Sequence, residues 1–191
     1  MSKKKRDDSY FAAGRRRNRK YMMIIAPIVV AVAAAGAAGA VLYQPPEAAA
    51  ISGVECNRNE FDNYHLHSHL DVFVNGEERQ VPNSVGILNS PSCLYWLHTH
   101  TSDGVIHVEA PQTREFTLGQ FLDIWNQTRD SAGFFDSVAG MNATAYVAGD
   151  DFEGNYRDVK LDSLKQIALV YGEDPEDIPE EFDFAGENIT R

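Results

Sequence analysis

HLHSHLDVFVNG, at residues 65–76, is the most informative stretch of this 191-residue chain. Successive side chains of a β-strand point to opposite faces of a sheet. The polar and apolar side chains of this stretch therefore fall on separate faces: His65, His67, His69 and Asp71 on one, and Leu66, Leu70, Val72 and Val74 on the other. The apolar set predicts the core face. Asn75-Gly76 predicts a tight hairpin turn, with residues 77–81 as the returning strand.

Two further strands, at residues 94–101 and 105–109, are predicted to carry the other histidines. His98 and His100 share one face of the first strand, and His107 and Glu109 share one face of the second. If Asp103-Gly104 is a two-residue turn, His100 lies opposite His107 and His98 lies opposite Glu109. Four ligand-type side chains then converge on one patch outside the core.

This patch predicts a metal site. Opposed Cβ atoms lie about 4.5–5.5 Å apart, which allows three imidazoles and a carboxylate to meet one ion. The first candidate ligands are His98, His100, His107 and Glu109, and the strand at residues 65–71 would add supporting partners or a second site through His65, His67, His69 and Asp71. Imidazole and carboxylate ligands favour copper as Cu(II), or zinc. The alternative is a solvated or hydrogen-bonded histidine array with Asp71 and Glu109 as its salt partners.

The rest of the domain is predicted to be α+β with a mainly antiparallel sheet. Thr117 and Gln120 form a capping box that starts a helix with an apolar face, which packs on the sheet. Further strands are expected at residues 143–148, 157–161 and 167–171. Cys56 and Cys93, the two cysteines of the chain, are expected to form a disulfide.

Charge is distributed unevenly along the chain, whose formal net charge is −11. Residues 1–20 contain nine of the 17 Lys and Arg residues, whereas residues 44–191 contain 26 of the 28 Asp and Glu residues. An acidic segment of this kind repels phosphate backbones. The composition therefore excludes nucleic acid as a partner and favours cations.

An uncharged run from Met22 to Leu42 separates the two charged parts. At about 1.5 Å per residue it is long enough to cross a hydrocarbon layer of ~30 Å. It predicts a signal-anchor topology in the plasma membrane, with a single span and the N-terminus in the cytoplasm. A cleaved signal peptide is the alternative, because the run ends in small residues. The small residues of the span would also allow a homodimer or contact with a membrane protein.

The predicted organisation has five parts. They are a basic cytoplasmic segment at residues 1–20, a transmembrane helix at 21–43, a stalk at 44–50, an extracytoplasmic histidine-rich domain at 51–172 and an acidic tail at 173–191. The stalk and the tail are expected not to pack into a core.

Three motifs resemble a family of uncharacterised secreted or membrane-anchored prokaryotic proteins. They are HLHSHLDVFVNG at residues 65–76, CLYWLHTH at 93–100 and GVIHVEAP at 104–111, followed by the helix start FTLGQF at 116–121. The resemblance covers residues 61–172. It implies the limits of the domain and no assigned activity.

Three functions of different class stay open. The first is a membrane-anchored extracytoplasmic metal-binding protein for Cu(II) or Zn. The second is a metalloenzyme with a three-histidine, one-glutamate site and an open position for water or substrate. The third is a surface interaction domain with structural or pH-sensing histidines. The number of histidines favours the first, and the enzyme question stays open.

Overall fold

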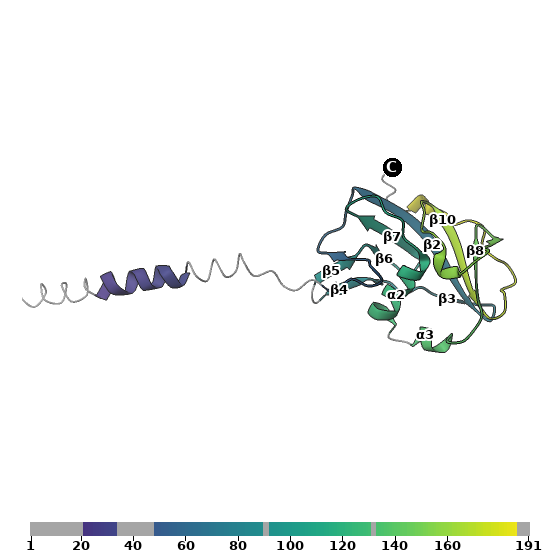
Figure 1. Ribbon diagram of the computed structural model, residues 1–191, viewed down its shortest axis with the longest axis horizontal. Coiled ribbons are helices and arrows are strands. Elements are labelled where there is room, and N and C mark those ends of the chain that lie inside the picture. Colours follow the sequence, from purple (N-terminus) through teal and green to yellow (C-terminus); the bar gives the residue numbers. More distant parts are fainter. Residues whose placement is uncertain (1–20, 34–47, 90–91, 131–132, 187–191) are drawn as a thin grey trace, which may run out of the picture. The chain divides into compact units, whose positions relative to one another are not determined.

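The computed structural model describes residues 21–33, 48–89, 92–130 and 133–186 (Figure 1). The chain divides into two units, Met1–Pro45 and Pro46–Arg191. The second unit is a sheet-rich α+β fold. In chain order its elements are β1 (Cys56–Asn57), β2 (Tyr64–Val74), β3 (Glu77–Arg79), β4 (Ile87–Asn89), β5 (Ser92–Tyr95), β6 (Leu97–His98), β7 (Val105–Ala110), α2 (Leu118–Arg129), α3 (Phe134–Ser137), β8 (Ala143–Val147), β9 (Asp150–Asp151), the 3₁₀ turn η1 (Tyr156–Asp158), β10 (Lys165–Tyr171) and the 3₁₀ turn η2 (Phe184–Gly186).

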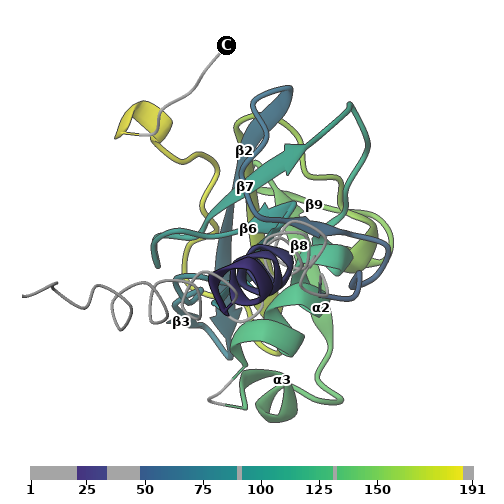
Figure 2. The same cartoon turned by 90° about the vertical axis from the view of Figure 1, so that its left-hand side faces the viewer.

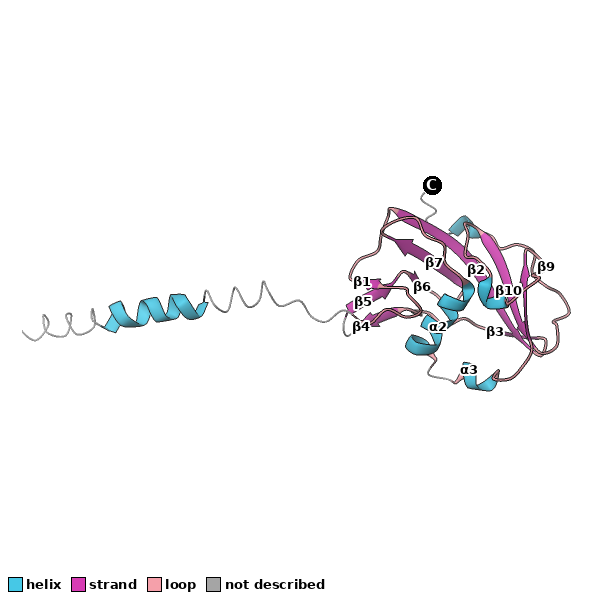
Figure 3. Ribbon diagram, viewed as in Figure 1, coloured by secondary structure: helices cyan, strands magenta, loops and turns pink. Residues whose placement is uncertain are grey.

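A mixed sheet forms the centre of the domain. Among the described residues it has seven strands in the order β6-β7-β2-β10-β8-β9, with β3 pairing with β2 beside this path. β2 and β10 are parallel and lie side by side in Figures 1 and 3, whereas the other described pairs of this sheet are antiparallel. A smaller sheet has the order β1-β5-β4.

One face of the large sheet carries the hydrophobic core. Leu70, Val72, Ile106, Val108 and Leu97 are all at most 1% exposed, and they belong to one buried cluster that includes the apolar side of α2. The alternation in the sequence predicted this face correctly. Burying a side chain of this size contributes about 1.5–3 kcal/mol relative to leaving it exposed.

The opposite face of the sheet is covered in part by the segment after β10. Ile178 packs against Phe73, Ala168 and Val170, and the ring of Phe182 stacks on His69 with centroids 3.7 Å apart. Figure 2 shows the yellow C-terminal turn on the side of the sheet away from α2. The expectation that the acidic tail does not pack was therefore wrong for its described part, because its few apolar side chains find an apolar surface on β2 and β10.

The helix α2 begins as the sequence predicted. Thr117 Oγ1 accepts a hydrogen bond from the Gln120 backbone N–H, and the Gln120 side chain accepts one from the Thr117 backbone N–H. The capping box satisfies two backbone donors that the first turn of a helix leaves without intrahelical partners. Phe121 and Trp125 then lie on the buried side of the helix.

The two predicted hairpins have different outcomes. β2 and β3 pair Val74 with Glu77 across Asn75-Gly76, and both turn residues have positive φ, as expected for this turn. In the second, β6 ends at His98 and pairs it with His107, so residues 99–104 form a longer loop and the predicted register was wrong. The Thr99 backbone N–H donates to the Val85 carbonyl, and the Gly104 carbonyl accepts from the Leu70 backbone N–H. These backbone groups are therefore not available to extend the pairing of β6 with β7.

The strand expected at residues 157–161 is also absent from the described chain. Residues 156–158 form the turn η1, in which Asn155 Oδ1 accepts from the Arg157 backbone N–H. The Arg157 guanidinium donates to Asp123 and to the Gly119 carbonyl, which ties this turn to α2. The local side-chain bond favours the turn at residues 156–158, and only an isolated antiparallel bridge between Thr117 and Lys160 forms at the end of the predicted strand.

The transmembrane prediction was contradicted. Residues 21–33 form a helix, and residues 34–42 of the predicted span lie outside the described residues. Within the described residues, no helix has both the length and the apolar character that a membrane span requires. This finding overturns the predicted single-pass anchor and plasma-membrane placement, while the remainder of the predicted span lies outside the described residues.

The disulfide prediction is confirmed. Cys56 and Cys93 are bonded, with Cα atoms 5.6 Å apart, and join β1 to β5. The last residues of the predicted stalk belong to the same region, because the Tyr95 hydroxyl donates to the Ala49 carbonyl and Ala48 packs against the core.

Gly104→Ala should destabilise the domain far more than Gly140→Ala. Both glycines have positive φ, so alanine costs about 1–2 kcal/mol of backbone strain at either position. A Cβ at Gly104 would also lie close to the Leu70 carbonyl and 2.9 Å from His69 Nε2, whereas one at Gly140 meets nothing within 4 Å. Urea unfolding should show a loss of more than about 3 kcal/mol for the first variant only. Equal losses would contradict this close approach.

Candidate metal centre

Three histidines form a row across the sheet, one on each of three adjacent strands. β7 lies between β2 and β6, and its His107 pairs with His67 on one side and His98 on the other. In the neighbouring row, Glu109 pairs with His65. All of these side chains lie on the face opposite the core.

Four residues form the first group able to hold a metal ion: His98, His100, His107 and Glu109. One ligand atom from each lies within 4.8 Å of the others. His98 Nε2 is 3.2 Å from His100 Nε2 and 3.9 Å from Glu109 Oε1, and His107 Nδ1 is 3.6 Å from the same oxygen. These are the four residues that the sequence placed together.

A second group contains His65, His67 and His107. His67 Nε2 lies 3.1 Å from His65 Nε2 and 3.1 Å from His107 Nδ1. A neutral imidazole nitrogen carries one in-plane hydrogen or one in-plane lone pair. A single nitrogen therefore cannot make a good hydrogen bond to both neighbours, whereas a cation can accept lone pairs from all three.

Glu109 supplies the buried negative charge of the cluster. It is 3% exposed, and its Oε1 lies 3.2 Å from His65 Nε2. Its other oxygen, Oε2, is buried without a hydrogen-bond partner, which holds for no other side-chain polar atom in the described part of the chain. A buried carboxylate oxygen without a partner is costly, so this position favours a bound cation.

The buried imidazoles do not supply a positive charge to balance the Glu109 carboxylate. Burial lowers the pKa of His67, His98 and His107 to about 4 in each case. Neighbouring histidines lower the pKa further for all three, while Glu109 opposes the shift at His67 and His98. The rings are therefore neutral at pH 7, which is the form that binds a metal ion.

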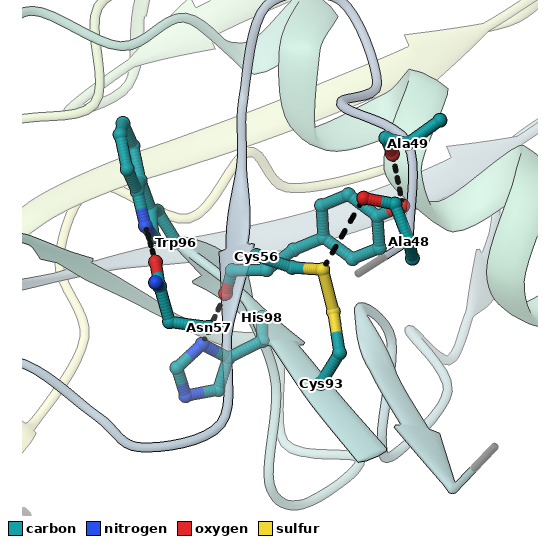
Figure 4. The surroundings of a disulfide bond; sticks show 8 residues. Ala48, Ala49, Cys56, Asn57, Cys93, Trp96 and His98 are labelled. Carbon is teal, nitrogen blue, oxygen red and sulfur yellow. Dashed lines mark hydrogen bonds between the residues drawn. A yellow bond between two sulfur atoms is a disulfide. The ribbon is translucent and has the colours of Figure 1, made fainter. Parts of the chain in front are cut away.

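His98 is oriented by the small sheet. Its Nδ1 lies 2.8 Å from the Tyr95 carbonyl, and because a carbonyl only accepts, Nδ1 carries the hydrogen and Nε2 presents its lone pair to the cluster. Tyr95 pairs directly with Cys56 of the disulfide. Figure 4 shows His98 in the surroundings of this disulfide, where the Trp96 indole also donates to Asn57 Oδ1 at 2.8 Å.

The structure does not bring His69 and Asp71 into the cluster. His69 lies opposite Val105 on β7 and Gln166 on β10, so it has no ligand-type neighbour in its row. Its Nδ1 lies 2.8 Å from Gln166 Oε1 and its Nε2 lies 2.6 Å from the Asp103 carbonyl. Both ring nitrogens are directed at oxygen atoms outside the cluster, and Asp71 accepts from Gln166.

Glu60 is a member of the site that the sequence did not reveal. Its Oε1 lies 3.3 Å from His100 Nε2, and both side chains are open to solvent, at 48% and 40% exposure. An acidic residue in a loop before β2 has no periodicity to mark it. His100 and Glu60 form the solvent-facing edge of the cluster, so an ion can enter there.

Comparison with known proteins gives no further assignment. No protein-family model, curated protein sequence or solved structure matches the chain. The resemblance to an uncharacterised prokaryotic family therefore stays a prediction, and the functional argument rests on the geometry of the cluster.

The metal-free domain should lose stability as the pH falls from 7.5 to 5.5. His67, His98 and His107 have a pKa of about 4 in the folded state, below the ordinary value of 6.5 that they regain on unfolding. The unfolded chain therefore binds more protons in this window, and protonation favours unfolding. Urea midpoints in the presence of a chelator should decrease, with a weaker dependence in His107→Gln. A midpoint that stays constant over this window would contradict neutral buried rings.

Removing the disulfide should loosen His98 as well as the fold. The two cysteines are 37 positions apart in the sequence. The Cys56→Ser/Cys93→Ser double variant should lose about 4 kcal/mol of folding stability, because its unfolded chain is no longer restricted by the bond. Nitrogen NMR of the imidazoles should show His98 protonated at Nδ1 in the native protein and a mixture of tautomers in the variant. An unchanged His98 spectrum would show that Tyr95 is held independently of the disulfide.

Proposed function

We propose that this domain is a metal-binding protein that takes up a divalent transition-metal ion, zinc or Cu(II), through His98, His100, His107 and Glu109. The observation that carries the proposal is the buried Glu109 carboxylate, whose Oε2 has no hydrogen-bond partner within a ring of imidazole nitrogens. A divalent cation is the group that satisfies both the charge and the lone pairs.

The spacing of the donor atoms supports this proposal. Four donors at about 2.0–2.1 Å from a tetrahedral zinc lie about 3.3–3.4 Å from one another. Three of the six separations in this group are 3.2, 3.6 and 3.9 Å, and all six are within 4.8 Å, so side-chain rotations bring the atoms to coordinating positions. Imidazole with carboxylate is a ligand set suited to zinc and to Cu(II).

The ligand count favours binding over catalysis by a single ion. Four protein ligands complete a tetrahedral shell, whereas a catalytic zinc keeps a position for water or substrate. A purely structural role for the histidines is disfavoured, because imidazoles that serve only as hydrogen-bond partners would not place one nitrogen 3.1 Å from two others.

The test is calorimetric titration of zinc and Cu(II) into the purified protein and its His100→Ala variant at pH 7. His100 is 40% exposed, so its removal should leave the fold intact while the affinity falls at least tenfold. Glu115→Gln is the control, since Glu115 is exposed and pairs with Lys160 away from the cluster. Equal affinity in the native protein and His100→Ala, or no binding by the native protein, would overturn the proposal.

A further inference from the structure

The two ligand groups together contain more donors than one ion uses. The shared residue is His107, and the union of the groups is His65, His67, His98, His100, His107 and Glu109. Zinc in protein sites takes four ligands in most cases. An ion held by His98, His100, His107 and Glu109 would leave His65 and His67 beside it.

The surplus histidines have coordinating geometry of their own. The separations from His67 Nε2 to His65 Nε2 and to His107 Nδ1 are both 3.1 Å, near the 3.3–3.4 Å edge expected for donors at about 2.0–2.1 Å from a tetrahedral ion. An ion in the first group alone would leave His67 Nε2 facing two other ring nitrogens. A second ion among these three would accept the lone pairs of all of them.

Glu109 lies between the two groups. Its Oε1 is 3.2 Å from His65 Nε2 in the second group and 3.9 Å from His98 Nε2 in the first. It is also 3.6 Å from His107 Nδ1, which lies 3.1 Å from His67 Nε2. A carboxylate with one oxygen in this position and the other without a partner is placed to contact two ions.

We infer that the cluster is a two-metal centre, in which His98 and His100 hold one divalent ion, His65 and His67 hold the other, Glu109 lies between them, and the lone pair of His107 serves one of the two ions. This inference rests on the proposed function and extends it to a second ion. Two-metal sites place their ions about 3.5–4 Å apart. Six protein side chains shared by two ions leave coordination positions for solvent or for an added ligand, which a single four-ligand site does not.

Substitutions can test metal binding by each of the two ligand groups separately. His65→Ala removes a partly buried donor from the second group, and His98→Ala removes a donor from the first. Asp71→Asn is the matched control: Asp71 lies on the same strand and face as His65, but its carboxylate accepts from Gln166 outside the cluster. Zinc and Cu(II) content is measured after removal of loosely bound metal, and circular dichroism verifies that each variant is folded.

The native protein and Asp71→Asn should each retain two equivalents, and His65→Ala should retain one. Cu(II) in the native protein should give the electron paramagnetic resonance spectrum of a spin-coupled pair, because unpaired electrons about 4 Å apart interact strongly. His65→Ala should give the spectrum of an isolated Cu(II). If His98→Ala does not fold, the stoichiometry and spin coupling of the native protein still decide the matter.

The outcomes separate this inference from the proposed function. One equivalent in the native protein, lost in His100→Ala and retained unchanged in His65→Ala, would overturn the second ion while the single site stands. Two equivalents with uncoupled Cu(II) spectra would overturn the position of Glu109 between the two ions. Binding of neither metal by the native protein would overturn both proposals.

Discussion

The pairing of β7 between β2 and β6 is the constraint on which the site depends. Both neighbours meet β7 at His107, which places His67 and His98 on either side of it. The same hydrogen bonds set Leu66 and Leu97 against Val108 on the core face. A slip of one residue would move every ligand to the core and every apolar residue to the other side. The register of the candidate metal ligands is therefore maintained by the burial of Val108 and its neighbours.

Segments distant in the sequence complete the cluster. β2 carries His65 and His67, and its position is set by the two strands that flank it. His98 and His100 depend instead on the small sheet and on loop contacts: Tyr95 orients His98, and Thr99 bonds to Pro82 and Val85. The two halves of the cluster are thus positioned by different parts of the fold and meet at β7. This explains why the disulfide, which lies in the small sheet, bears on the orientation of a ligand in the large one.

The sequence predicted the composition of the site better than its register. Alternation along a strand has a period of two, so it assigned His98, His107 and Glu109 to one face without knowledge of their partners. The predicted turn set His100 opposite His107, whereas the structure sets His98 there. This offset is two residues, an even number, so each ligand kept its face and the cluster survived the error. An odd offset would have turned the side chains of one strand to the core face and broken up the predicted cluster.

Other features had no local signature in the sequence. The parallel pairing of β10 with β2 is a contact between residues about 100 positions apart, and it explains why His69 bonds to Gln166 and not to the cluster. Phe182 covers His69 from a segment whose acidic composition predicted a solvated tail. The uncharged run at residues 22–42 had the length of a membrane span, but among the described residues no helix has both the length and the apolar character of a span. Local patterns predicted local structure, and the long-range pairings had to be observed.

The rigidity of the sheet has a consequence for the choice between metals. Sites with nitrogen and oxygen donors bind Cu(II) more tightly than zinc when the donors are free to rearrange, because Cu(II) gains from a tetragonal geometry. Here His67, His98 and Glu109 are at most 3% exposed and are carried by strands whose other face is packed core. Moving their donors into one plane would require those strands to shift against close-packed side chains. If the proposed site binds metal, the fixed row across β2, β7 and β6 would reduce the intrinsic advantage of Cu(II), most for the buried donors and least for the exposed His100.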